Sequence, residues 1–499
     1  MRRYNILFVV MFSWLCASCY DDKGNYDYKD KLNIRVEGIE KSYHVIPFKD
    51  TVAFNPKIYP EERNYECFWG VVPYNERYAV LDTLSKERSW KFPVELPVGN
   101  YILRFFAKDT ETGIFSYTEY EFLVESELNV GWWVLKDDGD DTDVDLFTSK
   151  REIPDIISKV NGRRLAGEAK NILFELKYAQ VDEKDGKVSN APAVVVGSCK
   201  DIGVLDLYTG QFVGEYDKLF YELPANRNVG TMFKGNSALH AYVDNKLYTM
   251  PIKNWGALYT KFSVQVEGDY ELSPYRHSSP GGIPILFNNS NSSFCGLRST
   301  STGIEYFRDI AGKPSSNNMD MEPVFIGGRK KDWAGDRAYV ILKKRGKEEY
   351  HLAKLKGYPA FSQTPIEEMN AMPAGLKLYA AKYKTLNQDN DIVYFAEGNK
   401  IYSCNLETSQ ESLQSVNIPS GEEITYMESI KYDPYGMNDI WFDYVAIGTV
   451  RGGRYKLYLH PLHAGMLQPA IKVLEGKGRV KRAVYIEVTG KGIYSSSLF

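Results

Sequence analysis

Apolar and polar residues alternate along most of this chain, and turn residues interrupt the alternation at short intervals. The clearest case is residues 99–109, where every second side chain is apolar, followed by a turn at 111–113 and a return strand over 118–124. A period of two residues is typical of strands with one buried face, and a glycine-containing turn between two such runs indicates a hairpin. After residue 131 no window of twelve residues holds a clean 3.6-residue apolar pattern, and only 153–159 has the pattern of one or two helical turns. The pattern therefore predicts an all-β protein.

Residues 32–127 have the pattern of a small immunoglobulin-like β-sandwich. A strand over 65–72 carries Trp69 between apolar neighbours, so we expect this ring in the core rather than exposed as a ligand platform. The run G-x-Y-x-L-x-F-x-x-x-D-x-x-T-G over 99–113 is similar to the last hairpin of PKD and related immunoglobulin-like domains. The segment holds no cluster of catalytic residue types, and we interpret it as a spacer.

Residues 128–499 show a different pattern, in which a unit of strand, short polar turn and strand recurs. Residues 245–252 (NKLYTMPI) align with residues 399–406 (NKIYSCNL), and shorter echoes follow at 456–462 and 491–494. About eight such hairpins over roughly 370 residues give one per 46 or so, the length of a four-stranded propeller blade. We therefore predict a β-propeller of seven or eight blades; both numbers stay open because a propeller often completes one blade from both chain ends. A long array of β-sandwiches is the alternative, because no WD, sialidase or kelch signature supports the periodicity.

Residues 1–18 form a hydrophobic leader. Arg2 and Arg3 precede an apolar run at 6–15, and small residues stand directly before Cys19. Ten apolar residues are too few to span a bilayer as an uncleaved anchor. A cysteine in this position resembles the lipobox of bacterial lipoproteins, although Cys16 replaces the usual Leu or Val. The resemblance implies cleavage before Cys19 and lipidation of its thiol; a disulfide between the two cysteines is the alternative, and cleavage would separate its partners.

The polar tail over residues 19–31 carries a second signal. Asp21 and Asp22 resemble the acidic export signal of Bacteroidota lipoproteins that are displayed on the outer face of the outer membrane. The run CYDDKGNYDYKD also resembles the opening of the PKD-like lipoprotein family of gut Bacteroidota, members of which are associated with SusC/SusD-type uptake systems. The resemblance implies a surface lipoprotein on a flexible stalk, and it says little about activity.

Composition and charge narrow the possible partners. The 37 Tyr, 24 Phe and 8 Trp residues favour strands. The formal charge is −4 and becomes −6 without the leader, which carries two arginines and no acid, so we expect no nucleic-acid binding. The remaining cysteines are too far apart for a zinc motif or a dense disulfide scaffold, and we expect buried free thiols at Cys67, Cys199, Cys295 and Cys404.

Common signatures of catalysis are absent from the sequence. The serine-hydrolase, zinc-protease, dinucleotide and P-loop motifs do not occur. We interpret the close pair His460 and His463 as ordinary surface or rim imidazoles rather than a metal site. We interpret the acidic run at 137–145 as a solvated hairpin turn, because Leu146 stands where an EF-hand loop needs glycine. No cofactor, metal or catalytic residue is assigned, although a carboxylate pair for glycoside hydrolysis would be invisible in a sequence.

Binding is the function that the sequence favours. We expect an accessory binding protein of a nutrient uptake system, anchored in the outer membrane by lipid, with a glycan as ligand and a SusC/SusD-like complex as partner. Three aromatics in turn-rich segments of the propeller fit a sugar platform, namely Trp255, Trp333 and Tyr435. Trp132 and Trp133 open a strand and are expected in the core or between blades. A polysaccharide-degrading propeller enzyme and a scaffold lipoprotein without a small ligand are the alternatives.

The lipid anchor can be tested with a matched pair of variants. Cys19→Ala should no longer partition into the detergent phase of a cell extract, because the acylated thiol is lost. Cys16→Ala should still be lipidated, since its thiol is removed with the leader. Equal loss of partitioning in both variants would contradict the assignment of Cys19.

Overall fold

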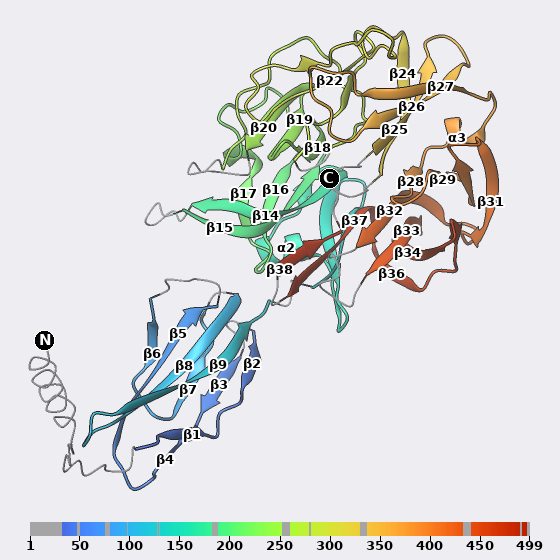
Figure 1. The fold of residues 1–499 in the computed structure, drawn as a ribbon. Coiled ribbons are helices and arrows are strands. Elements are labelled where there is room, and N and C mark those ends of the chain that lie inside the picture. Colours follow the sequence, from blue (N-terminus) through green and yellow to red (C-terminus); the bar gives the residue numbers. More distant parts are fainter. Residues whose placement is uncertain are drawn as a thin grey trace, which may run out of the picture. The chain divides into compact units, whose positions relative to one another are not determined.

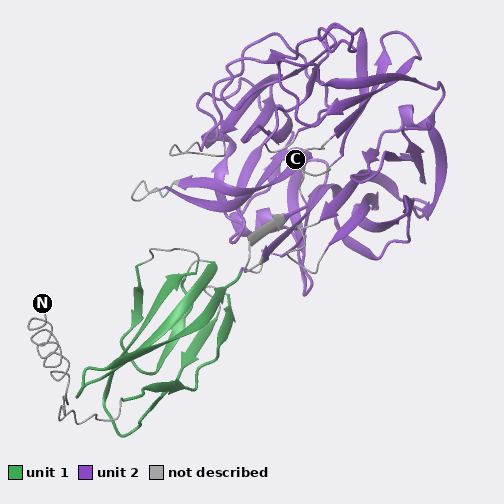
Figure 2. Cartoon of the chain, viewed as in Figure 1, with its two compact units in different colours: residues 1–125 green, residues 126–499 purple. Residues whose placement is uncertain are grey.

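The computed structural model describes residues 32–46, 50–74, 80–96, 98–126, 128, 130–181, 188–251, 260–278, 281–329, 337–432, 441–489 and 492–496. The chain forms two compact units, residues 1–125 and residues 126–499, which Figure 2 colours separately. Both units are built almost entirely of strands, which confirms the all-β prediction. Within these described ranges, no helix is long and apolar enough to cross a membrane.

The first unit is a β-sandwich of nine described strands. Its larger sheet has the order β2-β9-β8-β5-β6, and two small sheets pair β1 with β4 and β3 with β7. The predicted hairpin is formed by β8 and β9, which pair from Gly99↔Val124 to Lys108↔Phe115. The strands are β1 (Arg35–Glu37), β2 (Ser42–Val45), β3 (Thr51–Phe54), β4 (Lys57–Tyr59), β5 (Tyr65–Pro73), β6 (Asp82–Ser85), β7 (Trp90–Pro93), β8 (Gly99–Asp109) and β9 (Phe115–Val124).

The core of the sandwich is built around Trp69 in β5. Its side chain is fully buried, and its ring centroid lies 4.5 Å from those of Phe54 and Phe105. The indole Nε1 donates a hydrogen bond to the backbone oxygen of Glu87 at 3.1 Å, which satisfies the one polar atom of the ring. Trp69 is therefore a core residue, as predicted.

The described strands of the second unit form a β-propeller of seven sheets, which follow one another around a ring in Figure 1. Seven is the lower of the two predicted blade numbers. The sheets, in chain order, are β10 (Val130–Asp137), β11 (Asp141–Phe147), β12 (Glu152–Ile153) and β13 (Leu165–Ala166) with β37 (Arg479–Thr489) and β38 (Gly492–Ser495); β14 (Ala169–Val181), β15 (Val188–Ser198), β16 (Ile202–Asp206) and β17 (Phe212–Glu215); β18 (Val229–Gly235), β19 (Ala238–Val243) and β20 (Lys246–Pro251); β21 (Leu286–Asn288), β22 (Ser293–Gly296) and β23 (Glu305–Tyr306); β24 (Met321–Arg329), β25 (Arg337–Lys344), β26 (Tyr350–Lys356) and β27 (Ile366–Met372); β28 (Lys384–Leu386), β29 (Ile392–Glu397), β30 (Lys400–Asn405) and β31 (Gln410–Asn417); β32 (Glu423–Tyr432), β33 (Phe442–Arg451), β34 (Arg454–His463), β35 (Met466–Leu467) and β36 (Lys472–Lys477).

Helical structure in the described part of the propeller unit is limited to short pieces. They are α2 (Ile156–Asn161), α3 (Lys377–Ala380) and a 3-10 turn, η2 (Tyr216–Lys218). α2 overlaps the segment 153–159, for which the sequence predicts one or two helical turns.

Hydrophobic clusters between neighbouring sheets hold the ring together, and the described residues form one cluster at each of the seven interfaces. Trp133 packs into the cluster shared with the sheet of β14, and Trp132 packs into the cluster shared with the sheet of β32. Two successive residues reach two interfaces because successive side chains of a strand point to opposite faces. Both rings are buried, so the predicted place of these tryptophans between blades is confirmed.

The two ends of the propeller unit share one sheet. β37, near the C-terminus, pairs with β10 from Val130↔Glu487 to Asp137↔Arg479. β37 also supplies Val484 to one of the clusters beside this sheet and Tyr485 to the other. The pairing therefore removes an open strand edge and completes two interfaces at once.

The repeated segments 245–252, 399–406 and 456–462 lie in or overlap the third strands of their sheets. β20, β30 and β34 are each the third strand of a sheet and each follow a two-residue turn. In the turn before β20, Asp244 and Asn245 have φ values of 49° and 60°, and in the turn before β34, Gly452 and Gly453 have values of 57° and 71°. Hairpin turns of two residues need positive φ, which Gly, Asn and Asp tolerate best. The repeat in the sequence therefore reflects the backbone geometry of these hairpin turns.

The acidic run at 137–145 is a solvated turn over only part of its length. Residues 138–140 connect β10 to β11, whereas Asp137 at the end of β10 and Asp143 and Asp145 in β11 are buried. The prediction of a solvated turn was wrong for these three residues because both faces of a propeller strand are covered by neighbouring blades. Among the described residues, no group of three or more His, Cys, Asp or Glu side chains is arranged to hold a metal ion.

Asp143 and Asp145, the two buried aspartates of β11, organise their surroundings. Asp143 accepts a hydrogen bond from the backbone N–H of Ile157 at 2.8 Å and so fixes the first turn of α2. Asp145 forms an ion pair with the buried Lys136 at 2.6 Å and accepts a hydrogen bond from the hydroxyl of Tyr455 at 2.7 Å. These carboxylates act in the structure of the ring.

Ring closure predicts a difference between two fragments. Residues 126–499 expressed alone should fold and unfold in one cooperative thermal transition, because the ring covers its own strand edges. Residues 126–478 lack β37 and should show no cooperative transition. Without β37, one edge of β10 is unpaired, and the two hydrophobic clusters beside this sheet lose the residues that β37 supplies. Thermal unfolding followed by circular dichroism measures both; a cooperative transition in the shorter fragment would contradict the role of β37.

Candidate functional site

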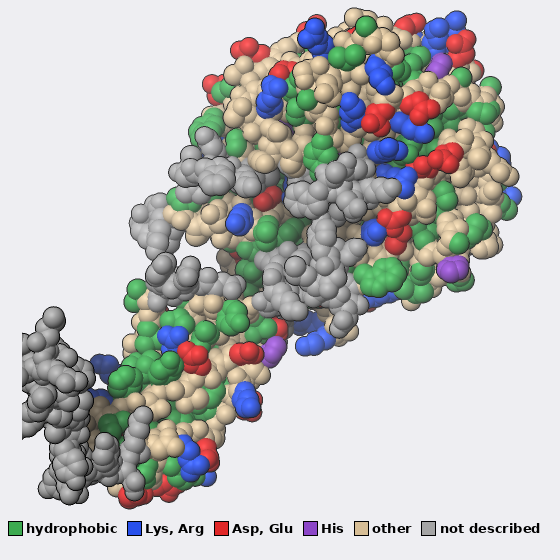
Figure 3. Space-filling view, in the orientation of Figure 1, with side chains coloured by type: hydrophobic (Ala, Val, Ile, Leu, Met, Phe, Trp, Pro, Cys, Tyr) green, Lys and Arg blue, Asp and Glu red, His purple; other side chains and the backbone are tan. Residues whose placement is uncertain are grey.

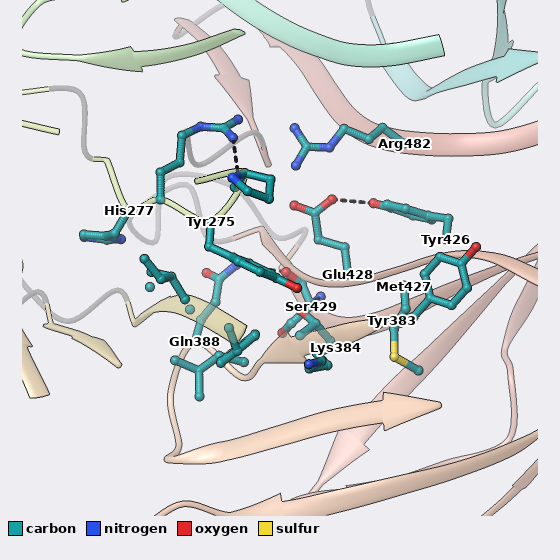
Figure 4. Close-up of a pocket in the computed structure, with 18 of the residues that line it drawn as sticks. Tyr275, His277, Tyr383, Lys384, Gln388, Tyr426, Met427, Glu428, Ser429 and Arg482 are labelled. Atoms are coloured by element: carbon teal, nitrogen blue, oxygen red, sulfur yellow. Dashed lines mark hydrogen bonds between the residues drawn. The ribbon is translucent and has the colours of Figure 1, made fainter. Parts of the chain in front are cut away.

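A cavity of about 420 Å³ lies inside the propeller unit. Its walls are β24, β28, β32 and β37 together with the segment 274–278 that precedes β21, as Figure 4 shows. Neighbouring strands of this series contact one another, and β24, β28 and β32 each open their sheet, so the cavity lies where the innermost strands converge. The volume falls within the range of about 300–1,000 Å³ that is typical of small-molecule sites.

Three buried polar atoms of the cavity wall have no hydrogen-bond partner among the described residues. They are Oε1 of Gln388, Oγ1 of Thr425 and Oγ of Ser429. The amide of Gln388 is oriented by its Nε2, which donates to the backbone oxygen of Ser429 at 3.2 Å. Buried polar groups are nearly always hydrogen-bonded, and each unsatisfied one costs roughly 1–3 kcal/mol. Three around one cavity require a polar occupant, either water or a ligand.

A pair of glycines in β24 allows two other parts of the cavity wall, at Leu386 and His277, to lie close to this strand. A Cβ atom at Gly327 would lie 2.6 Å from Cβ of Leu386, and a Cβ atom at Gly328 would lie 2.5 Å from Nδ1 of His277. Both distances are well inside van der Waals contact, so only glycine fits without displacement. The glycine pair therefore helps to set the path of 274–278 along the cavity.

Basic side chains outnumber acidic ones in the cavity wall. Arg276, Lys384, Lys481 and Arg482 line it with a single described carboxylate, that of Glu428. The labelled side chains in Figure 4 show Arg482 and Glu428 directed into the same part of the cavity from β37 and β32. Burial lowers the pKa of His277 to about 4, so its imidazole is uncharged at neutral pH.

Both lysines already have partners in the protein. The ammonium group of Lys481 lies 3.5 Å from Asp137 and 3.6 Å from Glu168. Lys384 donates to two backbone oxygens at 3.0 Å, and burial lowers its pKa to about 8. The cationic groups left to act on an occupant are therefore the two arginines.

The two arginines are close enough to influence each other. Arg276 is held by the backbone, because its guanidinium donates to the oxygens of Met232 at 3.1 Å and Pro274 at 3.3 Å. Burial, and after it the charge of Arg482, lowers the pKa of Arg276 to about 9. Arg482 has no hydrogen bond or ion pair with another residue in the described ranges.

Tyrosines provide the remaining polar and aromatic surface. The hydroxyl of Tyr426 donates to Glu428 at 2.6 Å, and burial together with this carboxylate raises the pKa of Tyr426 far above its usual range. Tyr275 and Tyr383 add rings to the wall. Glycoside hydrolysis usually requires two carboxylates about 5–9 Å apart, and the described wall contains one. The arrangement therefore suits binding of a polar molecule.

The sequence-predicted site residues belong to segments that the structure does not describe. Trp255, Trp333 and Tyr435 lie outside the described residues, and so do Cys19, Asp21 and Asp22. These assignments remain predictions. In the chain, the segments that contain Trp333 and Tyr435 directly follow β24 and β32, two of the strands that line the cavity.

The histidine and cysteine predictions are correct in part. His463 is exposed, as expected of a surface imidazole, but His460 is buried and its Nδ1 contacts the backbone oxygen of Gln468 at 2.9 Å. Burial lowers the pKa of His460. His460 was misplaced because β34 is covered on both faces by its neighbours. The four described cysteines are free; Cys295 and Cys404 are buried, whereas Cys67 and Cys199 are half-buried.

Sequence comparison supports the resemblance of the N-terminal part. A model of the PKD-like family matches residues 19–169. The match begins at the cysteine assigned to lipidation and extends past the sandwich through β13 of the propeller. A search of curated proteins gives no match.

Solved structures with a similar course of the chain include two proteins from Bacteroides. A quinonprotein alcohol dehydrogenase-like protein from Bacteroides thetaiotaomicron is 10% identical with a TM-score of 0.38, and the alignment covers 89% of this chain and 96% of that one. A DUF4784 family protein from Bacteroides caccae is 10% identical with a TM-score of 0.31, covering 77% and 95% of the two chains.

The close approach at Gly328 can be tested by adding one methyl group. Gly328→Ala should destabilise the propeller unit by about 1–3 kcal/mol, because the new Cβ overlaps the His277 ring and forces 274–278 to move. Gly281→Ala is the matched control, since a Cβ there meets nothing within 4 Å. Chemical denaturation of both variants measures the difference, and equal stability would contradict the tight fit.

Proposed function

We propose that this protein is a lipid-anchored surface protein that binds a small polar nutrient, a sugar or short glycan, in the central cavity of its propeller. It acts as an accessory binding protein of an uptake system of the SusC/SusD type. The observation that carries the proposal is the cavity itself, with three unsatisfied polar atoms on its wall.

The chemistry of the wall favours a sugar over an apolar ligand. Amide and hydroxyl oxygens can exchange hydrogen bonds with sugar hydroxyls, and the tyrosines offer flat faces to the apolar side of a sugar ring. An apolar occupant would displace water from Gln388, Thr425 and Ser429 and leave their polar atoms unsatisfied. A polar molecule with several hydroxyls satisfies all three at once.

Features of the N-terminal region support the cellular role. The leader, Cys19 and the acidic pair Asp21 and Asp22 resemble the signals of surface-displayed lipoproteins, and the PKD-like match starts at Cys19. The face of the molecule seen in Figure 3 carries mixed Lys, Arg, Asp and Glu side chains in its described part, without a patch of one sign. Such a surface does not favour nucleic acid as the partner.

Binding in the cavity can be tested on the soluble form, residues 20–499, by titration calorimetry with glucose, galactose, glucuronate and galacturonate. We expect at least one of these sugars to bind with one-to-one stoichiometry. Thr425→Val should weaken that binding about five- to tenfold, because the hydroxyl that meets the sugar is replaced by a methyl group of similar shape. The ligand-free variant should keep its thermal stability, since this hydroxyl has no described partner.

A second threonine provides the control. Thr449 is fully buried, lies outside the cavity wall and donates to Glu422 at 2.7 Å. Thr449→Val should therefore lower the melting temperature and leave sugar affinity unchanged. If none of the four sugars binds, or if Thr425→Val binds as well as the native protein, the proposed site is wrong.

A further inference from the structure

Positive charge in the central cavity exceeds what its described walls neutralise. Lys481 is paired with carboxylates outside the cavity, and Lys384 is held by backbone oxygens. Arg276 and Arg482 remain, with Glu428 as the one carboxylate of the described wall. Glu428 is already engaged as the acceptor of the Tyr426 hydroxyl. At least one guanidinium charge is therefore left without a counter-charge.

Arg276 and Arg482 are half-buried, and holding two like charges close together in a partly enclosed cavity is unfavourable unless something compensates them. Charged groups that lose part of their hydration are normally paired. The lowered pKa of Arg276 reflects this cost, since burial and the neighbouring Arg482 both disfavour its charge. The backbone oxygens of Met232 and Pro274 nevertheless hold Arg276 in this position. A structure that fixes an arginine beside another arginine is preorganised for an anion.

We propose that the cavity recognises the anionic group of an acidic sugar, a carboxylate or a sulfate ester, between Arg276 and Arg482. Gln388, Thr425 and Ser429 then hydrogen-bond to the hydroxyls of the same molecule. This inference rests on the proposed function and specifies its ligand class.

Guanidinium groups suit this task better than ammonium groups. Arginine presents several N–H donors in one plane, which match the two oxygens of a carboxylate or sulfate. Arg276 uses donors of both terminal nitrogens on backbone oxygens, whereas Arg482 has its full set free of described partners. Arg482 is thus the principal ligand-binding arginine, and Arg276 supplies a second charge.

The size and polarity of the cavity indicate a sugar acid rather than a bare inorganic anion. A sulfate ion between the arginines would leave most of the 420 Å³ unfilled and would leave the three orphan atoms of β32 and Gln388 unsatisfied. A hexose ring bearing one acidic group fills more of the space and supplies hydroxyls to those atoms. One molecule then supplies both the negative charge for the arginines and the hydroxyl groups for the three unsatisfied polar atoms.

The test compares four probes on the soluble form by titration calorimetry: glucuronate, glucose 6-sulfate, glucose and inorganic sulfate. We expect glucuronate or glucose 6-sulfate to bind at least tenfold more tightly than glucose and than inorganic sulfate. Whichever of the two acidic sugars binds more tightly identifies the anionic group. Arg482→Gln should weaken that binding at least tenfold, and Arg482→Lys should recover part of the loss because it keeps the charge.

Arg454→Gln is the matched control, because it removes an equal charge from the exposed first residue of β34 and should leave affinity unchanged. The melting temperature of ligand-free Arg482→Gln separates binding from a structural role. It should equal or exceed that of the native protein, since a repulsion is removed, whereas a fall would show that Arg482 is a structural partner of Glu428 and would overturn the inference.

The failure of this inference differs from the failure of the proposed function. Glucose binding as tightly as the acidic sugars, with no effect of Arg482→Gln, would overturn the anion preference and leave sugar binding in place. Tightest binding by inorganic sulfate would replace the sugar acid with a free anion and also overturn it. Absence of binding by all four probes, together with none by galactose or galacturonate, would overturn both.

Discussion

Closure of the seven-sheet ring is the constraint on which the second unit depends. Every blade buries apolar side chains on both faces, so no blade can satisfy its surfaces without two neighbours. The ring has two free ends in the chain, and the pairing of β10 with β37 joins them. The tryptophans Trp132 and Trp133 show how one short segment serves two interfaces from a single strand.

The same closure explains why the centre of the ring is available for polar groups. The apolar contacts that stabilise the unit lie between the sheets, away from the place where the innermost strands converge. Only some members of the clusters, such as Leu386, Tyr426 and Met427, also line the cavity. β32 can therefore present Thr425, Glu428 and Ser429 toward the centre while neighbouring residues of the strand, such as Ile424 and Ile430, join the clusters between blades. A single strand thereby contributes both to stability and to the cavity wall, and Tyr426 and Met427 take part in both.

Charge inside the cavity follows a different rule from charge on the surface. Exposed pairs of opposite sign contribute little to stability, whereas buried charges need partners. Lys136 and Asp145 meet this need within the protein, at 2.6 Å and away from the cavity. The half-buried Arg276 and Arg482 have no carboxylate of their own within the described wall. This contrast with the Lys136–Asp145 pair distinguishes a structural charge from one arranged for a ligand.

The sequence by itself determined the all-β class, the sandwich with Trp69 at its core, the propeller and the tryptophans between its blades, because strand period and hairpin turns are local properties of the chain. It did not determine the cavity. Arg276, Gln388, Thr425 and Arg482 come from four separate segments, and only the convergence of innermost strands brings them together. The glycine pair at 327–328 and the polar residues within the apolar run of β32 were the available signals, but neither shows its meaning without the ring. Burial of Asp143 and His460 was likewise decided by blades that lie far away in the sequence, since a strand's second face is covered only when the tertiary structure closes.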